Sequence, residues 1–525
     1  MTSTAAVPAS SGADDSRLIV VSNRLPVVLS RSEDGWRAEP GSGGLVSAML
    51  PVLRNRGGMW IGWPGTHYDD PAEIEDVLAT AGRAAGYELH PVRLSAREED
   101  LFYHGFSNEI LWPLFHDSPS RCVFQPDYWE AYSAVNRRFA EITAAQLQAN
   151  DFVWLHDYHL LSAAHYLRDL GVEQQLAFFL HIPFPPPDIF MRLPWRKQVL
   201  QHLLEYDLIG FHTLRDRRNF IQCLRQQFRE VRRSARRQVV SLQVDNVSRG
   251  EGGDPQWREL RCGIFPISID FKVFQQHARS EAVMRRSDWI RSDLRGRKLM
   301  LAVSRLDYSK GIPESLEGYA RALRRYPELH RKIIYTLVVV PSRRSIPEYA
   351  ELKSNIERLV GEINGEFTDS GWVPVHYLYR SLPVEELVAY YRTADIGLIM
   401  PLKDGMNLIA KEYCAAQVRH DGVLILSEFA GAAAELGRSA LLVNPHDFDG
   451  VADAIVAACD MPVGERRARM RALRRTVRNA DIFRWVEGFI QAATSRDLSH
   501  YPIFEETALD GEADVIAQPI PAMSV

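Results

Sequence analysis

Short, continuous apolar runs alternate with longer amphipathic stretches along most of the chain. Runs of this kind are typical of buried strands in parallel sheets that helices cover on both faces. The runs form two sets along the chain: 18–22, 59–63, 152–156, 177–181 and 208–211, then 298–304, 333–340, 375–378, 396–400, 423–427 and 440–443. The pattern therefore predicts an α/β protein.

Two separate sets of strands predict two Rossmann-like, doubly wound parallel-sheet domains that face a central cleft. We expect an N-terminal domain over residues 17–265 and a C-terminal domain over 266–481. A helix over 482–498 is expected to return and complete the first domain. Residues 1–16 and 501–525 have the composition of disordered tails.

Two segments late in the first domain lack the apolar pattern. Residues 245–255 are rich in Gly, Asp and Ser, which indicates a surface loop. A basic run precedes that loop and is interpreted as a solvated helix face, with a subunit contact or an anionic effector site left open. This run consists of Arg232, Arg233, Arg236 and Arg237.

Composition narrows the choice of partners. The 525 residues carry a net charge of -5, so electrostatics give no reason to expect nucleic acid or an anionic membrane as partner. The five cysteines are scattered without a CxxC pair, which indicates reduced thiols. Because the first 15 residues lack both Lys/Arg and an apolar core, and no apolar run reaches about 18 residues, we expect a cytoplasmic protein.

Two cations and two carboxylates of the second domain follow its predicted strands. Arg305 and Lys310 lie after the run 298–304, and Asp404 and Glu412 lie after 396–400. Both cations can neutralise the charge that grows on a nucleoside diphosphate leaving group, and the carboxylates can accept hydrogen bonds from sugar hydroxyls. Transfer of a sugar from its nucleotide is the leading interpretation. A salt-bridged surface loop and a capping aspartate are the structural alternatives.

Other polar residues follow strands of the first domain. Arg24 comes just after the first strand, Asp157 directly after the third, and His181 ends the fourth. Ligands of open α/β sheets bind beyond the carboxyl ends of the strands, so we expect these side chains to line the cleft. Gly41–Leu45, which contains Gly43 and Gly44, predicts a loop that brings backbone N–H groups close to a phosphate or sugar.

Two segments have an alternative interpretation as metal sites. These are His156-Asp157-Tyr158-His159 and Asp447-Phe448-Asp449. A metal site needs three or four converging ligands, and no further grouping has suitable spacing. We therefore expect no essential metal and no cofactor, with Asp157 serving as a hydroxyl acceptor or base.

Taken in order, the motifs resemble those of the trehalose-6-phosphate synthases, a family of retaining glycosyltransferases with two Rossmann domains. The similarity runs from about residue 17 to about 497. It rests on residues 21–24, 41–45, 60–63, 106–108, 111–113, 154–160, 181–185, 305–311, 404–412 and 427–432.

This resemblance implies a role for each matching position. The acceptor, glucose 6-phosphate, would be held by Arg24, Tyr103, Trp112, Asp157 and Arg343. The nucleotide sugar would be held by Gly43, Gly44, Arg305, Lys310, Leu382, Asp404, Leu408, Ile409, Ala410, Lys411 and Glu412. The catalytic set would be Trp112, Asp157, His181, Arg305, Lys310 and Asp404.

The implied reaction is transfer of glucose from a nucleoside diphosphate glucose to glucose 6-phosphate, giving α,α-trehalose 6-phosphate with retention of the donor anomer. UDP-glucose is the first expectation, with ADP- and GDP-glucose left open because segment 380–383 differs from the aromatic-containing version associated with uridine. A homo-oligomer, dimer or tetramer, is implied only by the resemblance. A transferase with another acceptor and a non-catalytic protein on the same fold are the alternatives.

Overall fold

The structure is a computed structural model that describes residues 17–32, 35–41, 46, 49, 53, 57–68, 70, 72–233, 238–245, 257–343 and 347–495. Several predictions made from the sequence concern residues outside these ranges. They are both tails, Gly43, Gly44, Arg236, Arg237 and most of the loop 245–255.

The first sheet has nine strands among the described residues, in the order β5-β4-β1-β6-β7-β8-β11-β10-β9. Its strands from β5 to β11 are parallel, and the last two pairings are antiparallel. The strands are β1 (Leu18–Arg24), β4 (Met59–Trp63), β5 (Glu88–Pro91), β6 (Phe152–His156), β7 (Gln175–Phe179), β8 (Leu208–Phe211), β9 (Val231–Arg233), β10 (Val239–Asp245) and β11 (Trp257–Ile264). A separate antiparallel hairpin joins β2 (Val27–Ser32) to β3 (Gly35–Pro40).

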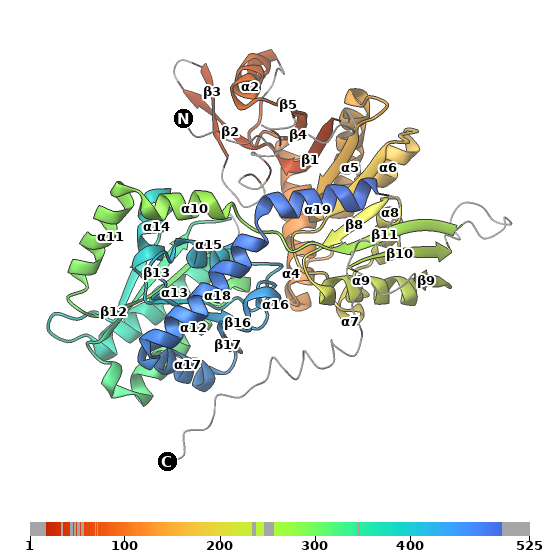
Figure 1. Cartoon of the computed structure of the whole chain (residues 1–525). Helices are drawn as coiled ribbons and strands as arrows, with labels where there is room; N and C mark the ends of the chain where they lie inside the picture. Colours follow the sequence, from red (N-terminus) through yellow and green to blue (C-terminus); the bar gives the residue numbers. More distant parts are fainter. Residues whose placement is uncertain are drawn as a thin grey trace, which may run out of the picture.

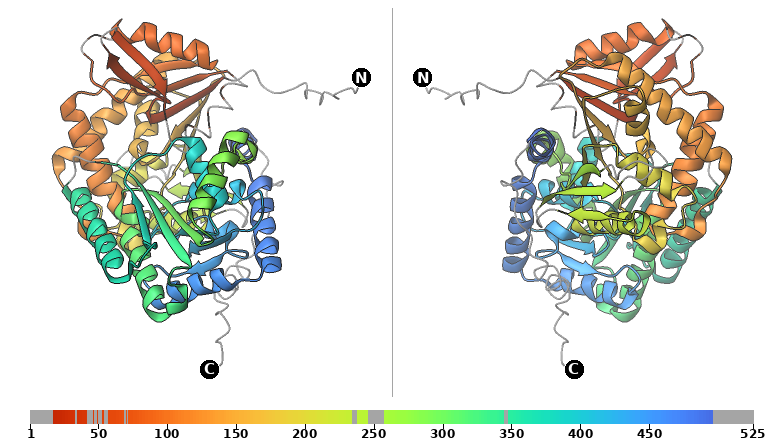
Figure 2. Two further views of the ribbon diagram at one scale, coloured as in Figure 1. Left: turned by 90° about the vertical axis from the view of Figure 1, so that its left-hand side faces the viewer. Right: turned by 90° about the vertical axis from the view of Figure 1, so that its right-hand side faces the viewer.

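Helices surround this sheet, red to yellow in Figures 1 and 2. They are α2 (Ala72–Ala85), α3 (Ala96–Glu98), η1 (Glu99–Leu111), α4 (Trp112–Phe115), η2 (Pro119–Arg121), α5 (Pro126–Gln146), η3 (Tyr158–Leu160), α6 (Ala163–Asp169), α7 (Pro187–Phe190), α8 (Arg196–Leu203) and α9 (Leu214–Gln227). The central strands β1, β6 and β7 are mostly apolar and buried along nearly their whole length, because both faces of the sheet are covered.

The second sheet has six parallel strands among the described residues, in the order β14-β13-β12-β15-β16-β17. They are β12 (Lys298–Arg305), β13 (Ile333–Val340), β14 (Val375–Leu378), β15 (Ile396–Ile399), β16 (Val423–Ser427) and β17 (Leu441–Val443). The helices around it are α10 (Phe271–Arg279), α11 (Glu281–Asp293), η4 (Tyr308–Lys310), α12 (Ile312–Arg325), η5 (Pro327–Leu329), α13 (Pro347–Phe367), α14 (Val384–Thr393), α15 (Leu408–Ala416), α16 (Ala433–Leu436), α17 (Phe448–Asp460) and α18 (Val463–Asn479).

The last described helix, α19 (Ile482–Thr494), packs on the first sheet although it follows the second in sequence (Figure 1). Phe489 stacks on Trp154 of β6 at 4.2 Å, and the Trp485 ring lies 5.0 Å from that of Phe179 at the end of β7. Aromatic packing of this size fixes the end of the chain to the first sheet. Residues 265–270 form the other connection between the two sheets.

The predicted α/β class with two parallel sheets is confirmed, and every apolar run corresponds to a strand. Several strands of the first domain were not predicted, and one helix prediction for it is wrong. The hairpin β2–β3 and the strands β5, β9, β10 and β11 were not predicted, and β10 and β11 alternate polar with apolar residues as half-buried antiparallel strands do. The helix predicted for the basic run is wrong, because Arg232 and Arg233 lie on the edge strand β9, where Arg232 stacks on Trp257. No helix in the described part of the chain is long and apolar enough to cross a membrane.

Candidate active site

The loop after β12 presents two cations at the carboxyl end of the second sheet. Arg305 ends the strand with an exposed side chain, and Lys310 ends the short helix η4. Asp307 between them is buried, and its side chain accepts a hydrogen bond from the backbone N–H of Ser309 at 2.9 Å. Gly311 follows at φ 63°, where a Cβ would lie 2.0 Å from the backbone oxygen of Met400, so only glycine fits this turn.

Lys310 and Asp404 meet from two loops of the second domain. The Lys310 Nζ lies 2.8 Å from Asp404 Oδ2, and Asn407 Nδ2 donates to the same oxygen at 3.1 Å. Burial alone would raise the pKa of Asp404, but Lys310 lowers it, so the carboxyl stays ionised. Asn407 also caps α15 by accepting a hydrogen bond from the Ala410 N–H, so the helix begins at Leu408.

Trp112 of the first domain has three cations of the second domain around its ring. The distances from the ring centroid are 4.4 Å to the guanidinium of Arg343, 5.8 Å to that of Arg305 and 5.9 Å to the ammonium of Lys310. The indole Nε1 is buried without a hydrogen-bond partner among the described residues. The two domains therefore meet at a tryptophan that faces a cluster of positive charge.

Arg343 is almost fully buried and is held from both domains. Its side chain pairs with Asp307 at 3.5 Å, donates to the hydroxyl of Tyr349, and donates to the hydroxyl of Tyr158 in the first domain at 3.4 Å. Burial alone would raise the pKa of Asp307, but Arg343, Lys310 and Arg305 lower it to about 2. Asp307 and Tyr158 were not assigned roles from the sequence; Asp307 lies between the two predicted cations, which was the available signal.

The predicted acceptor residues of the first domain lie near this cluster. The Arg24 guanidinium stacks on Trp63 at 4.1 Å and lies 5.6 Å from the ring of Tyr103, which in turn stacks on His159. Burial is the main cause that lowers the pKa of His159 to about 3, and the positive charges of Arg343 and then Arg24 contribute. Both arginines therefore lie close to this imidazole. Two arginines that converge in this way suit a dianionic phosphate.

Asp157 follows β6 in a strained backbone conformation, with φ 73°. Its carboxylate accepts a hydrogen bond from the backbone N–H of His181 at 3.2 Å. Burial raises the pKa of Asp157 to about 7, against the opposing effects of backbone hydrogen bonds and of Arg305. A buried carboxyl with such a pKa, at a strand end close enough to the second domain to sense Arg305, is typical of a functional group.

His181 is brought to the loop of Asp404 from the other domain. Its Nε2 lies 3.1 Å from Nδ1 of His156, and burial lowers the pKa of both imidazoles, so both are neutral. A Cβ on Gly405 would lie 2.3 Å from the backbone oxygen of His181. The two domains therefore touch at Gly405 through their backbones, which brings the loop that holds Asp404 next to His181.

The remaining predicted donor residues lie along α15 and in the loop before α14. Glu412 accepts a hydrogen bond from the Tyr391 hydroxyl at 2.9 Å, and burial raises its pKa to about 6. The Lys411 ammonium is buried against Glu435 and the backbone oxygen of Ile267 in the connection between domains, so its side chain is not free to bind a ligand. Leu382 is half-buried in the loop after β14.

The two segments considered as metal sites do not form a metal site within the described ranges. No group of three or more His, Cys, Asp or Glu side chains there has a geometry that could hold a metal ion. Asp447 instead caps α17 by accepting a hydrogen bond from the Gly450 N–H at 2.9 Å.

Two Rossmann-like domains with cations and neutral polar groups at their facing strand ends define a glycosyltransferase of the two-domain, GT-B class. The sequence profile described as glycosyltransferase family 20 matches residues 16–495, and the chain belongs to that family. It is similar to trehalose-6-phosphate synthase of Mycolicibacterium paratuberculosis, with 43% identity over 491 residues, 92% of this chain and 96% of that protein.

Solved structures agree with this assignment. One, described as trehalose-6-phosphate from E. coli bound with UDP-2-fluoro glucose, has a TM-score of 0.81 at 36% identity and covers 91% of this chain and 99% of its own. Another, an α,α-trehalose-phosphate synthase (UDP-forming) from Burkholderia xenovorans in complex with glucose-6-phosphate, has a TM-score of 0.79 at 32% identity and covers 91% of this chain and 100% of its own.

Proposed function

We propose that the chain is a trehalose-6-phosphate synthase, a retaining glucosyltransferase that moves glucose from UDP-glucose to glucose 6-phosphate and forms α,α-trehalose 6-phosphate. The observation that carries this proposal is the junction at Trp112, where Arg305 and Lys310 of the second domain face the acceptor residues of the first. Two relatives that cover almost the whole chain support it: one is a trehalose-6-phosphate synthase, and the other is described as UDP-forming and was solved in complex with glucose-6-phosphate.

The residues suggest a mechanism in which the leaving diphosphate takes part. Arg305 and Lys310 stabilise the charge that develops on it, and a leaving-group oxygen accepts the acceptor proton on the same face of the sugar. Asp404 and neutral His181 bind donor hydroxyls. Preorganised charge of this kind is the main catalytic contribution, and closure of the domains excludes water.

The acceptor is recognised on the first domain and at the domain junction. Arg24 and Arg343 bind its phosphate, and Asp157 accepts a hydrogen bond from a sugar hydroxyl. Tyr103 and Trp112 supply the walls of this subsite, with Tyr103 held by its stacking on His159. The donor subsite adds the main chain of Leu408–Glu412, and the backbone of Leu382 contacts the base.

The test is an initial-rate assay of purified protein with glucose 6-phosphate and UDP-, ADP- or GDP-glucose. We expect nucleoside diphosphate release to depend on glucose 6-phosphate and to be fastest with UDP-glucose. Release that is equally fast without the acceptor would contradict the proposal. The same assay with excess EDTA tests the expectation that no metal is essential, which predicts an unchanged rate.

The pKa of Asp157 predicts a pH dependence for acceptor use. The carboxyl accepts hydrogen bonds as an anion, so kcat/KM for glucose 6-phosphate should rise roughly tenfold between pH 6 and pH 8 as a group of pKa about 7 ionises. The acceptor phosphate itself ionises near pH 6, so Asp157→Asn serves as the control: its lower activity should show only that earlier ionisation. A variant that keeps the wild-type rise would show that another group is responsible.

We also propose a homo-oligomer, either dimer or tetramer, as the resemblance implies, and a cytoplasmic location, as the composition of the first residues predicts. Light scattering of the purified chain measures the first directly.

A further inference from the structure

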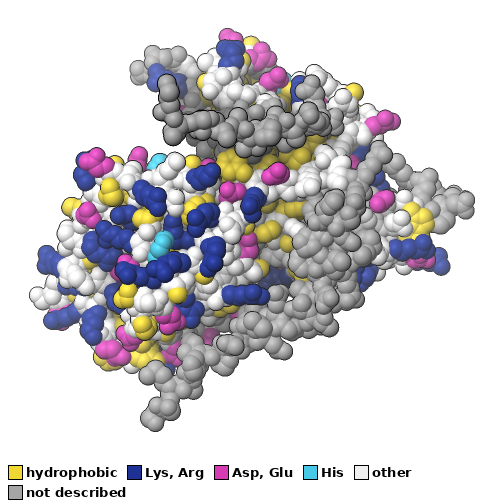
Figure 3. Space-filling model, in the orientation of Figure 1, with side chains coloured by type: hydrophobic (Ala, Val, Ile, Leu, Met, Phe, Trp, Pro, Cys, Tyr) yellow, Lys and Arg dark blue, Asp and Glu magenta, His cyan; other side chains and the backbone are white. Residues whose placement is uncertain are grey.

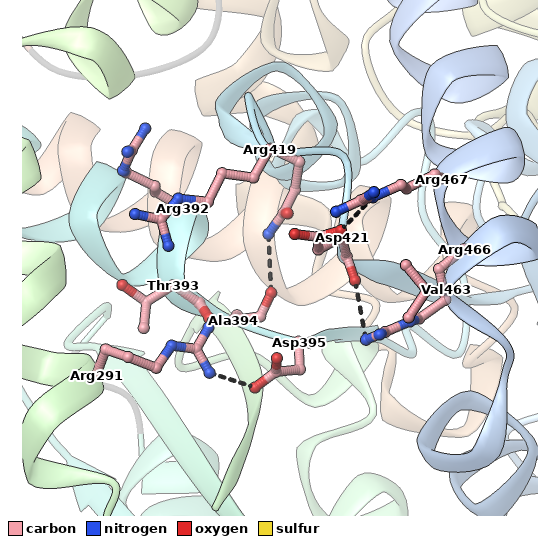
Figure 4. A pocket seen from close by; sticks show the side chains of 11 residues that line it. Arg291, Arg392, Thr393, Ala394, Asp395, Arg419, Asp421, Val463, Arg466 and Arg467 are labelled. Carbon is pink, nitrogen blue, oxygen red and sulfur yellow. Dashed lines mark hydrogen bonds and ion pairs between the residues drawn. The ribbon is translucent and has the colours of Figure 1, made fainter. Parts of the chain in front are cut away.

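A pocket of about 330 Å³ lies in the second domain, apart from the catalytic residues (Figure 4). It lies among α11, α14, the start of α18 and the loop that follows α15. Figure 3 shows Lys and Arg side chains gathered over the part of the molecule where Figure 1 places these helices. The residues that line the pocket are Arg291, Arg392, Thr393, Ala394, Asp395, Gln417, Arg419, Asp421, Val463, Arg466 and Arg467.

Arginines outnumber carboxylates in this lining. Five arginines stand against two aspartates, which gives a formal charge of +3. The aspartates are already engaged: Asp395 pairs with Arg291 at 2.9 Å, and Asp421 pairs with Arg467 at 2.9 Å (Figure 4). The excess positive charge is therefore not balanced within the pocket.

Arg392 and Arg466 carry two of these three charges, and the third, Arg419, lies 3.8 Å from Asp288 outside the lining. Each of the first two donates to a backbone oxygen, that of Ala278 at 2.7 Å or that of Asp421 at 3.3 Å, and neither makes an ion pair with a described residue. The Nε of each is buried and has no hydrogen-bond partner within the described ranges. A buried donor without an acceptor costs free energy, and burial followed by the charge of Arg419 lowers the pKa of Arg392.

The pocket and the catalytic cleft lie at opposite ends of the strands of the second sheet. Ala394 and Asp395 come just before β15, and Asp421 comes just before β16, so the pocket is at the amino ends of these strands. The catalytic loops follow the carboxyl ends, a strand length of roughly 13–17 Å away. A ligand in this pocket is therefore separate from the substrates.

We infer that this pocket binds a phosphate group, either free or as the phosphomonoester of a small metabolite. A phosphate offers several oxygens to guanidinium groups, which bind it in a planar, bidentate way. The first turn of α18 adds backbone N–H groups that could bind an anion. No side chain caps these groups, because the residue before the helix is Pro462. The volume is at the lower end of the range for small-molecule pockets, about 300–1,000 Å³.

The experiment measures thermal unfolding of the full chain with 10 mM phosphate against sodium chloride of equal ionic strength. The background is Arg24→Gln/Arg343→Gln, which weakens the proposed phosphate subsite of the cleft. The pocket variant adds Arg392→Gln/Arg466→Gln. The matched control instead adds Arg285→Gln/Arg358→Gln, which removes two exposed charges of the same domain from i,i+4 pairs.

We expect phosphate to raise the unfolding midpoint by about 2 °C in the background and the control, as for a site with an affinity near 1 mM. The pocket variant should lose this shift. Glycerol 3-phosphate distinguishes the sources: a larger shift than with inorganic phosphate identifies a phosphomonoester, and a smaller one identifies the free anion.

An unchanged shift in the pocket variant, or no shift in the background, would overturn the inference. If the pocket variant does not fold, the exposed pair Arg419→Gln/Arg467→Gln replaces it, with the same outcomes. In the otherwise wild-type chain, Arg392→Gln/Arg466→Gln should keep kcat and KM in phosphate-free buffer, because neither arginine contacts the cleft.

Discussion

Replacing Arg305 by alanine is expected to lower turnover by roughly 10²–10³, the usual cost of removing one donor that stabilises transition-state charge. Arg305 is the cation with most freedom to do this. Its side chain is exposed at the end of β12, whereas Lys310 is paired with Asp404 and Arg343 is buried against Asp307. The effect should fall on kcat, because charge on the leaving phosphate grows as the bond breaks.

The measurement is steady-state kinetics of Arg305→Ala with UDP-glucose and glucose 6-phosphate. Arg358→Ala is the control, since Arg358 is an exposed arginine on α13 that pairs with Glu362. Turnover of Arg305→Ala within a few-fold of wild type would remove Arg305 from the mechanism.

A single methyl group on Gly405 is expected to lower kcat/KM by about 10². The new Cβ would lie 2.3 Å from the backbone oxygen of His181 and 3.1 Å from the ring of His212, so the second-domain loop must retreat from the first domain. Asp404 and Lys310 move with that loop. A misplacement of about 1 Å at a reacting centre costs on the order of 10²-fold.

The matched control is Gly361→Ala on the surface of α13. Apart from its own helix and chain neighbours, no described residue comes within 4 Å of a Cβ placed there. Alanine in a helix is more favourable than glycine, so this variant should be active and no less stable. If Gly405→Ala kept wild-type kinetics, the close contact of the two domains at Gly405 would not be needed for catalysis.

The sequence predicted most of the parallel strands and placed the candidate side chains beyond their carboxyl ends, because continuous apolar runs and strand-end polar residues are local signals. Local patterns did not reveal β10 and β11, whose alternating residues form a half-buried antiparallel pair. They also could not show that Asp307 holds Arg343, since a contact over 36 positions depends on how two loops meet.

The same reason explains the side chains whose surroundings were not foreseen. Lys411 lies in a motif that favours a ligand, yet its ammonium is buried against Glu435 and the connection between domains. Arg291, Arg392 and Arg466 are far apart in sequence, and only the packing of three helices brings them into one pocket.

The most direct test of the central claim is the identity of the product. Purified protein, UDP-glucose and glucose 6-phosphate are incubated with excess EDTA, and the disaccharide phosphate is analysed by NMR. The proposed function predicts α,α-trehalose 6-phosphate, with both anomeric centres in the α configuration. A β linkage at the transferred glucose, or folded protein that binds UDP-glucose and yields no disaccharide phosphate with or without EDTA, would contradict it.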